Sequence, residues 1–132
     1  MTAVNWEELR AAAREVATRA YVPYSHFPVG AAALTDTGAI VTGTNVENAS
    51  YGVTLCAECA LVSKLHTDAL GNRLIAFACV DAHGAPLSPC GRCRQLLFEH
   101  GGSGLLIDGP DGQLTLGDLL PWAFGPENLE TP

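Results

Sequence analysis

Two pairs of cysteines in this chain have the spacing of metal ligands. Cys56 and Cys59 stand three positions apart, as do Cys90 and Cys93 in the segment PCGRC. Residues three apart at the start of a helix share a face, so two thiolates can converge on one ion. Four thiolates would form a structural zinc site, whereas three thiolates and one open position would form a catalytic one. The spacing alone leaves both alternatives open.

Glu58 would give an open metal position a purpose. It follows Cys56 by two positions, and in the interior of a helix such positions do not share a face. Cys56 and Glu58 can converge only if Cys56 precedes the first regular turn, and Cys59 then points elsewhere. Zinc lowers the pKa of a bound water toward neutrality, and a nearby carboxylate can move the protons.

Four segments of the chain resemble a known family. The letters CAE at Cys56 and PCGRC around Cys90 resemble the signature of the zinc nucleoside and nucleobase deaminases. YSHFPVGA, beginning at Tyr24, is similar to the Y-S-x-F-x-V-G-A segment of cytidine deaminases, and GTNVEN, beginning at Gly43, is similar to their G-x-N-x-E-N segment. The order, spacing and chain length resemble the small homotetrameric cytidine deaminases, over all but the last few residues.

The resemblance implies a reaction and a cofactor. Cys56, Cys90 and Cys93 would hold one zinc ion per chain, and Glu58 would shuttle protons. The expected reaction is hydrolytic deamination of free cytidine and 2′-deoxycytidine to uridine and 2′-deoxyuridine with release of ammonia, in pyrimidine salvage. The alternatives are a deaminase that acts on nucleic acid and a four-cysteine zinc module without catalysis.

The resemblance also implies a site for the sugar. Asn45 and Glu47 would hold the ribose, mainly at its 3′-hydroxyl, because a carboxylate accepts hydrogen bonds and an amide both donates and accepts them. An asparagine on its own more often closes a turn.

Four further residues are expected around the base by the same resemblance. Phe27 would stack on the pyrimidine ring, although a lone phenylalanine usually belongs to a core. Ala57 would contact the base through its backbone. Tyr51 and Phe124 would complete the pockets of neighbouring subunits in a homotetramer.

The negative charge of the predicted metal site must be offset by nearby positive charge. Three thiolates on a zinc dication leave a net charge of about −1, which helix N-termini and a nearby arginine would offset. Arg94 is expected to do so, although it could also be a solvated surface residue. Many relatives with three cysteine ligands resemble one another in carrying arginine at the position of Cys59. We interpret Cys59 as a buried apolar residue. Cys79 falls in a predicted core strand and is expected to be inert.

The elements that position these residues follow from hydrophobic periodicity. Asn5 is the expected N-cap of the first helix. The predicted order is a helix over 6–20, hairpin strands over 29–34 and 39–43, a helix over 56–66, a strand over 74–80, a helix over 91–100, strands over 105–107 and 113–116, and a short helix from 118. We expect one α/β domain over 1–132 with three layers, in which helices flank a central mixed five-stranded sheet. The hairpin would be antiparallel and the helix-linked strands parallel.

The charge and composition of the chain restrict the class of substrate and the expected location. Seven basic residues face fourteen acidic ones, a net charge of −7. Proteins that bind nucleic acid usually show a basic face, so this balance favours a small uncharged substrate. No apolar stretch suits a membrane span and no secretion signal is evident, so a cytoplasmic location is expected. Without such a signal, the five cysteines favour metal binding or catalysis over disulfides.

Overall fold

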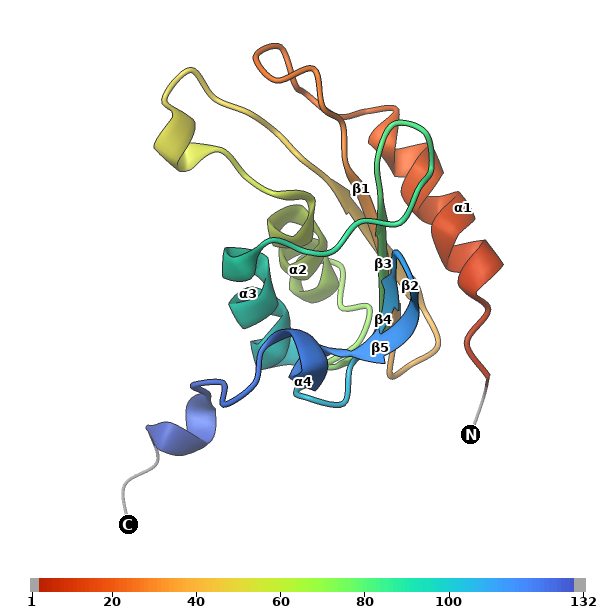
Figure 1. Cartoon of the computed structure of the whole chain (residues 1–132), viewed down its shortest axis with the longest axis vertical. Helices are drawn as coiled ribbons and strands as arrows, with labels where there is room; N and C mark the ends of the chain where they lie inside the picture. Colours follow the sequence, from red (N-terminus) through yellow and green to blue (C-terminus); the bar gives the residue numbers. More distant parts are fainter. Residues whose placement is uncertain (1–2, 130–132) are drawn as a thin grey trace.

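A five-stranded mixed sheet with helices on both faces forms the computed structural model, which describes residues 3–129 (Figure 1). This is the three-layer α/β fold that the sequence predicts. The elements are α1 (Trp6–Ala17), β1 (Gly30–Thr35), β2 (Ile40–Thr44), α2 (Ala57–Thr67), β3 (Leu74–Val80), α3 (Gly91–Gly101), β4 (Leu106–Gly109), β5 (Gly112–Thr115) and α4 (Leu116–Leu119), with short 3-10 turns at Tyr51–Val53 and Pro126–Asn128. Within the described residues, no helix is both long enough and apolar enough to cross a membrane.

The strands lie in the order β2-β1-β3-β4-β5. The β1–β2 hairpin is antiparallel, as predicted, and its turn places Gly38 at a φ of 87°, in the region that favours glycine. The helix-linked strands β3 and β4 are parallel neighbours, also as predicted. β1 pairs with β3 in antiparallel fashion, so β1 separates the other helix-linked pair, β2 and β3.

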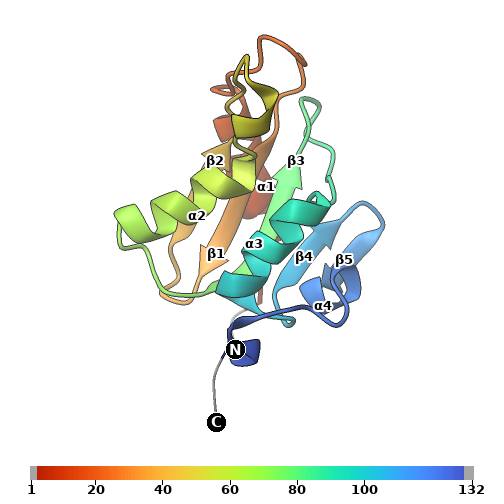
Figure 2. The same ribbon diagram turned by 90° about the vertical axis from the view of Figure 1, so that its left-hand side faces the viewer.

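Helices cover the two faces of the sheet unequally. Helix α1 lies on one face, and α2 and α3 lie side by side on the other (Figure 2). Alternation along β1 explains how one strand serves both faces: Ala32 packs with Leu9 and Ala13 of α1, whereas Ala31 and Ala33 pack toward α2. The two segments that carry the predicted metal-ligand cysteines therefore begin helices of the same layer.

Two glycines allow these helices to lie directly on the sheet. A Cβ atom at Gly43 would come within 2.5 Å of the Ala57 carbonyl oxygen and the Leu61 amide nitrogen of α2. A Cβ atom at Gly30 would come within 1.8 Å of the Ala13 carbonyl oxygen of α1. Because Ala57 directly follows Cys56, the absence of a side chain at Gly43 sets the height of the cysteine above the sheet.

The first helix is shorter than predicted. Asn5 is its N-cap, as expected, and the side chain accepts a hydrogen bond from the Glu8 amide at 3.1 Å. The helix ends at Ala17 rather than near Ala20. The next three amides bond to carbonyls three residues earlier, so the chain tightens and turns before Tyr21 pairs with Val46.

Candidate active site

Three cysteine sulfur atoms gather where α2 and α3 begin. The Sγ atoms of Cys56, Cys90 and Cys93 all lie within 4.8 Å of one another. Cys56 is the N-cap of α2 and Cys90 is the N-cap of α3, both in extended conformation, and Cys93 lies in the first turn of α3. Cys56 thus precedes the first regular turn, as convergence with Glu58 requires. The positive ends of two helix dipoles meet the thiolates here.

This donor set fits a zinc ion. Thiolates about 2.3 Å from a tetrahedral zinc stand about 3.8 Å apart, within the observed limit. Three protein ligands leave the fourth position for a reactant. In the part of the chain that the structure describes, no other trio of potential ligands gathers in this way.

Cys59 lies outside the sulfur cluster. Its Sγ faces the Arg92 guanidinium, whose Nη2 is 3.7 Å away. Cys59 is half-buried, because it lies toward the exposed side of α2. The expectation that Cys59 is a buried residue is therefore wrong. The separation of Cys59 from the other three sulfurs argues against a four-cysteine structural zinc site.

Glu58 lies buried beside the cluster. Only 4% of it is exposed, and burial raises the pKa of its carboxyl, while a hydrogen bond with Cys93 acts in the opposite direction. Removing a carboxylate from water disfavours its charged form. A carboxyl with a raised pKa can both accept and return a proton near neutral pH.

A cavity of about 190 Å³ opens in front of Cys56 and Glu58. Ala57 also lines this cavity. Its other walls are formed by residues from five segments of the chain, namely Val29, Asn45, Thr54, Leu55, Cys79, Leu87, Ser88 and Cys90. Most of these were missed by sequence reasoning, since they belong to loops that precede the motifs or to the end of a strand.

Cys79 is one of the missed wall residues. It lies in β3, as predicted, and its Sγ donates to the Leu87 carbonyl oxygen at 3.2 Å. Burial strongly raises the pKa of this thiol, so it stays protonated and supplies a neutral wall.

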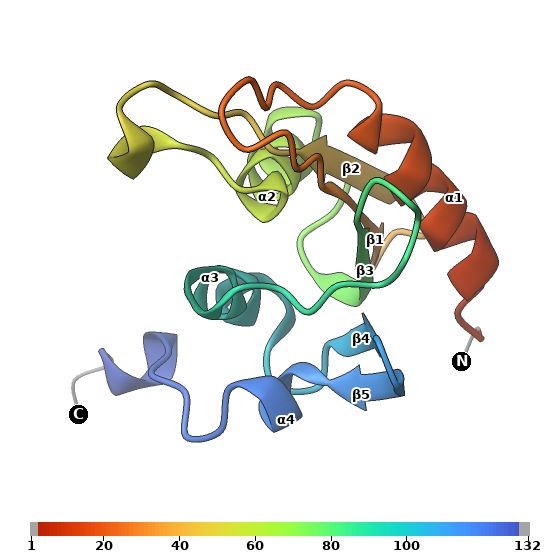
Figure 3. The same ribbon diagram turned by 45° about the horizontal axis from the view of Figure 1, so that its top comes forward.

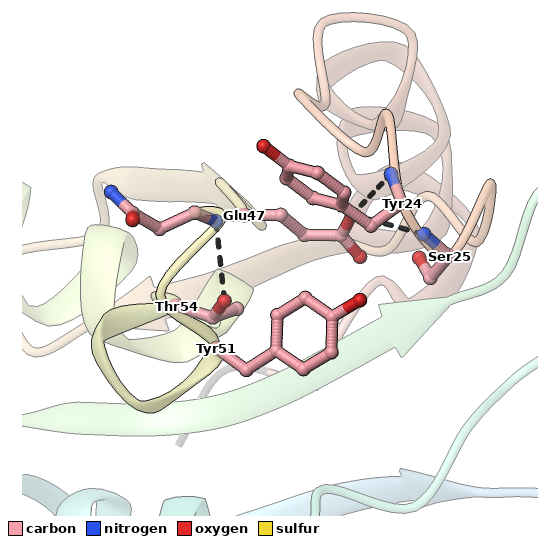
Figure 4. A pocket seen from close by; sticks show the side chains of 6 residues that line it. Tyr24, Ser25, Glu47, Tyr51 and Thr54 are labelled. Atoms are coloured by element: carbon pink, nitrogen blue, oxygen red, sulfur yellow. Dashed lines mark hydrogen bonds between the residues drawn. The ribbon is translucent and has the colours of Figure 1, made fainter.

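A second cavity, of about 270 Å³, adjoins the first at Thr54. Tyr24, Ser25, Glu47, Asn48 and Tyr51 complete its lining (Figure 4). The rings of Tyr24 and Tyr51 lie 5.9 Å apart. The two cavities together offer a metal-facing part and a part rich in hydroxyl and carboxylate groups.

Glu47 and Asn45 tie down the segment 24–29. One oxygen of Glu47 accepts the amides of Tyr24 at 3.0 Å and Ser25 at 3.1 Å, and hydrogen bonds from Ser25 lower the pKa of the carboxyl. Asn45 accepts the Val29 amide at 2.9 Å and donates to the Phe27 carbonyl at 3.0 Å. These contacts are a structural use of both side chains, of the kind that asparagine commonly serves in turns.

The predicted aromatic residues lie at the surface. Phe27 is 51% exposed and lines neither cavity, whereas Tyr51 is 74% exposed and lines the second. Phe124 is 58% exposed and lies in the C-terminal segment, which extends away from the sheet beyond α4 (Figure 3). Phe124 is thus removed from both cavities of its own chain.

Arg94 contacts carbonyl groups rather than sulfur. Its Nε donates to the Pro89 carbonyl at 2.9 Å, and its Nη1 donates to the Leu119 carbonyl at 3.0 Å. The side chain therefore connects the start of α3 with the end of α4. Any effect of the Arg94 charge on the cysteines is therefore electrostatic and does not pass through a hydrogen bond.

Comparisons with known proteins agree on one family. Residues 4–106 match the family described as "Cytidine and deoxycytidylate deaminase zinc-binding region". A cytidine deaminase from Mycobacterium tuberculosis is 63% identical over 129 residues, which cover 98% of this chain and 96% of that protein. The crystal structure of cytidine deaminase from Mycobacterium tuberculosis superposes with a TM-score of 0.90 at 64% identity, over 93% of this chain and 99% of that one. The cytidine deaminase from Mycobacterium leprae superposes with a TM-score of 0.88 at 53% identity, over 90% and 99% respectively.

Proposed function

Because this chain belongs to the cytidine deaminase family, as a zinc-dependent enzyme, we propose that it deaminates free cytidine and 2′-deoxycytidine by hydrolysis. The products are uridine, 2′-deoxyuridine and ammonia, which suits pyrimidine salvage. The observation that carries this proposal is the convergence of three thiolates and buried Glu58 on a single cavity, next to a second cavity with polar walls.

The cysteines and the glutamate divide the chemistry between them. Cys56, Cys90 and Cys93 would hold the zinc ion, which when bound supplies a Lewis acid that makes water acidic near neutral pH. Glu58 accepts the proton of the attacking water. It delivers this proton to the adjacent ring nitrogen. It then moves the remaining proton of the added hydroxyl to the amine, which leaves as ammonia, so one carboxyl serves as base and then as acid. Its burial supports both roles, because the raised pKa brings the two protonation states closer in energy.

Two helix ends balance the charge of the thiolates. Cys56 and Cys90 are N-caps, so the positive ends of the α2 and α3 dipoles lie at the sulfur cluster and favour negative charge there. Arg94 adds a positive charge next to Cys93 in sequence while its hydrogen bonds go to carbonyls. It is a positioning residue for α3 as well as a source of charge.

The second cavity suits a sugar. Glu47 lines it, and Asn45 lines the first cavity, so their polar groups flank the junction where a ribose 3′-hydroxyl would lie. Among the described residues, those lining the two cavities include no lysine or arginine. Phosphate groups are usually bound by such cations, which supports a nucleoside over a nucleotide or a polynucleotide.

Neighbouring subunits would complete the pocket. Tyr51, Trp122 and Phe124 are large and exposed, and such side chains are typical of interfaces. In a homotetramer, Phe124 and Tyr51 would close the pockets of adjacent chains, and Phe27 would stack on the pyrimidine ring.

Release of ammonia tests the proposal. The zinc-loaded protein is incubated separately with cytidine, 2′-deoxycytidine and a cytosine-containing oligonucleotide. We expect ammonia from the two nucleosides and none from the oligonucleotide. Ammonia from the oligonucleotide would overturn the substrate assignment, and silence on all three with zinc bound would overturn the proposed reaction.

A further inference from the structure

Two histidines meet at the opposite ends of the helices that begin at the sulfur cluster. His66 lies in the last turn of α2, and His100 lies in the last turn of α3. Nε2 of His66 and Nδ1 of His100 are 3.4 Å apart, and the ring centroids are 5.1 Å apart. Each helix has 11 residues, which corresponds to about 16 Å, so the pair is well separated from the cysteines. The deamination chemistry makes no use of either histidine.

The spacing of these nitrogens matches metal ligation better than hydrogen bonding. Hydrogen bonds donated by N–H groups usually span about 2.7–3.2 Å, shorter than the observed separation. Two nitrogens at about 2.0–2.1 Å from a tetrahedral zinc ion stand about 3.4 Å apart. We propose that His66 and His100 form a second cation site, for a divalent transition metal of the zinc or nickel class, that bridges α2 and α3.

The surroundings of the two histidines favour binding of a cation. Burial and the neighbouring His66 lower the pKa of His100, which favours the neutral imidazole that binds metals. His66 is exposed, which gives a hydrated ion access. The carbonyl ends of two helices carry partial negative charge toward a cation.

Other features keep this site weaker than the cysteine site. Arg73 places a positive charge near His100, which opposes a second positive charge there. Its Nη1 donates a hydrogen bond to the Glu99 carbonyl at 3.2 Å. No third protein ligand joins the two histidines within residues 3–129, so water would fill the remaining positions. The site is therefore a reversible metal clip, formed by His66 and His100, in which one bound ion would link α2 and α3 at the ends remote from the cysteines.

Titration of the holoenzyme with zinc chloride tests the clip. Protein that already holds one zinc per chain is titrated in a calorimeter, and its thermal unfolding midpoint is followed at each zinc concentration. We expect a second equivalent to bind with a dissociation constant on the order of 10–100 µM and the midpoint to rise by about 5–10 °C at a hundredfold excess over that constant.

Single substitutions assign the ligands. His66→Gln and His100→Gln should each weaken binding of the second zinc at least tenfold and remove the thermal shift, while deamination with one zinc per chain stays unchanged. His83→Gln, which changes an exposed histidine in the turn after β3, is the matched control and should retain the second site. Absence of a second equivalent up to about 1 mM zinc, or its persistence in both variants, would overturn the proposal.

Discussion

Glu58 combines deep burial with a position beside three sulfur atoms. It occupies the first turn of α2, where its backbone is near the positive end of the helix, yet only 4% of it is exposed. Burial disfavours its carboxylate, and the raised pKa is the consequence. Within residues 3–129 no cationic side chain forms an ion pair with this carboxyl. A buried carboxyl of this kind is costly to keep, which is typical of a functional residue.

Replacing Glu58 with glutamine tests its role. Glu58→Gln preserves size but cannot carry a proton, so we expect turnover to fall by about 10³-fold or more. Steady-state deamination of cytidine measures the loss. The zinc content, determined by atomic absorption, should remain one per chain, and substantial turnover in that zinc-loaded variant would remove Glu58 from the proton pathway.

Cysteine substitutions separate ligands from neighbours. Cys56→Ala removes one sulfur of the cluster, so most of the zinc should be lost. Cys59→Ala is the matched control, since Cys59 lies one turn further along the same helix and contacts Arg92 instead. Retained zinc in the first variant, or lost zinc in the second, would contradict the three-cysteine assignment.

At the scale of elements, the contact between α2 and β2 sets the position of the site. Gly43 allows the backbone of α2 to approach β2 closely, and Cys56 caps that helix. The cysteine is therefore held at a fixed height relative to the sheet and to α3. Close packing of this kind leaves little room for an added methyl group.

A methyl group at Gly43 should disturb both stability and the metal site. Gly43→Ala would force α2 away from β2, with an expected loss of about 1–3 kcal/mol in the free energy of unfolding. Chemical denaturation measures this loss, and the affinity for zinc should fall with it. Gly104→Ala, where a Cβ atom would meet nothing within 4 Å, is the control. Equal stability of the two variants would show that the close approach is unimportant.

The segment 24–29 depends on Asn45 for its conformation. His26 has a φ of 57°, which is unfavourable for a residue other than glycine, and Asn45 bonds to the backbone just beyond it. Asn45→Ala should speed hydrogen exchange at the Val29 amide and lower kcat/KM for cytidine by at least about tenfold. Asn45→Asp keeps the acceptor for Val29 and should exchange more slowly than the alanine variant. Unchanged exchange in Asn45→Ala would contradict this role.

At the scale of the whole molecule, the exposed aromatic residues predict assembly. Trp122 is fully exposed and Phe124 is 58% exposed, although both are apolar enough to favour burial. We expect analytical ultracentrifugation to find a homotetramer. Phe124→Ala should lower kcat/KM by at least about tenfold while each chain remains folded by circular dichroism. A monomer with full activity would count against shared pockets.

Local sequence patterns predict most of the secondary structure and the candidate zinc site. Periodicity and capping residues determine the helices and strands to within a few residues, because these signals act between neighbours in sequence. The motifs around Cys56 and Cys90 predict the zinc ligands and the role of Glu58, since their order and spacing resemble a known family.

Tertiary packing decided what those patterns left open. Whether Cys59 is a ligand depends on where α2 begins relative to α3, and the insertion of β1 between β2 and β3 depends on strand pairing. Cys79 and Ser88 reach the cavity only because β3 and the loop after it are brought next to α2. Such contacts join residues far apart in sequence, and packing of the core rather than local preference fixes them.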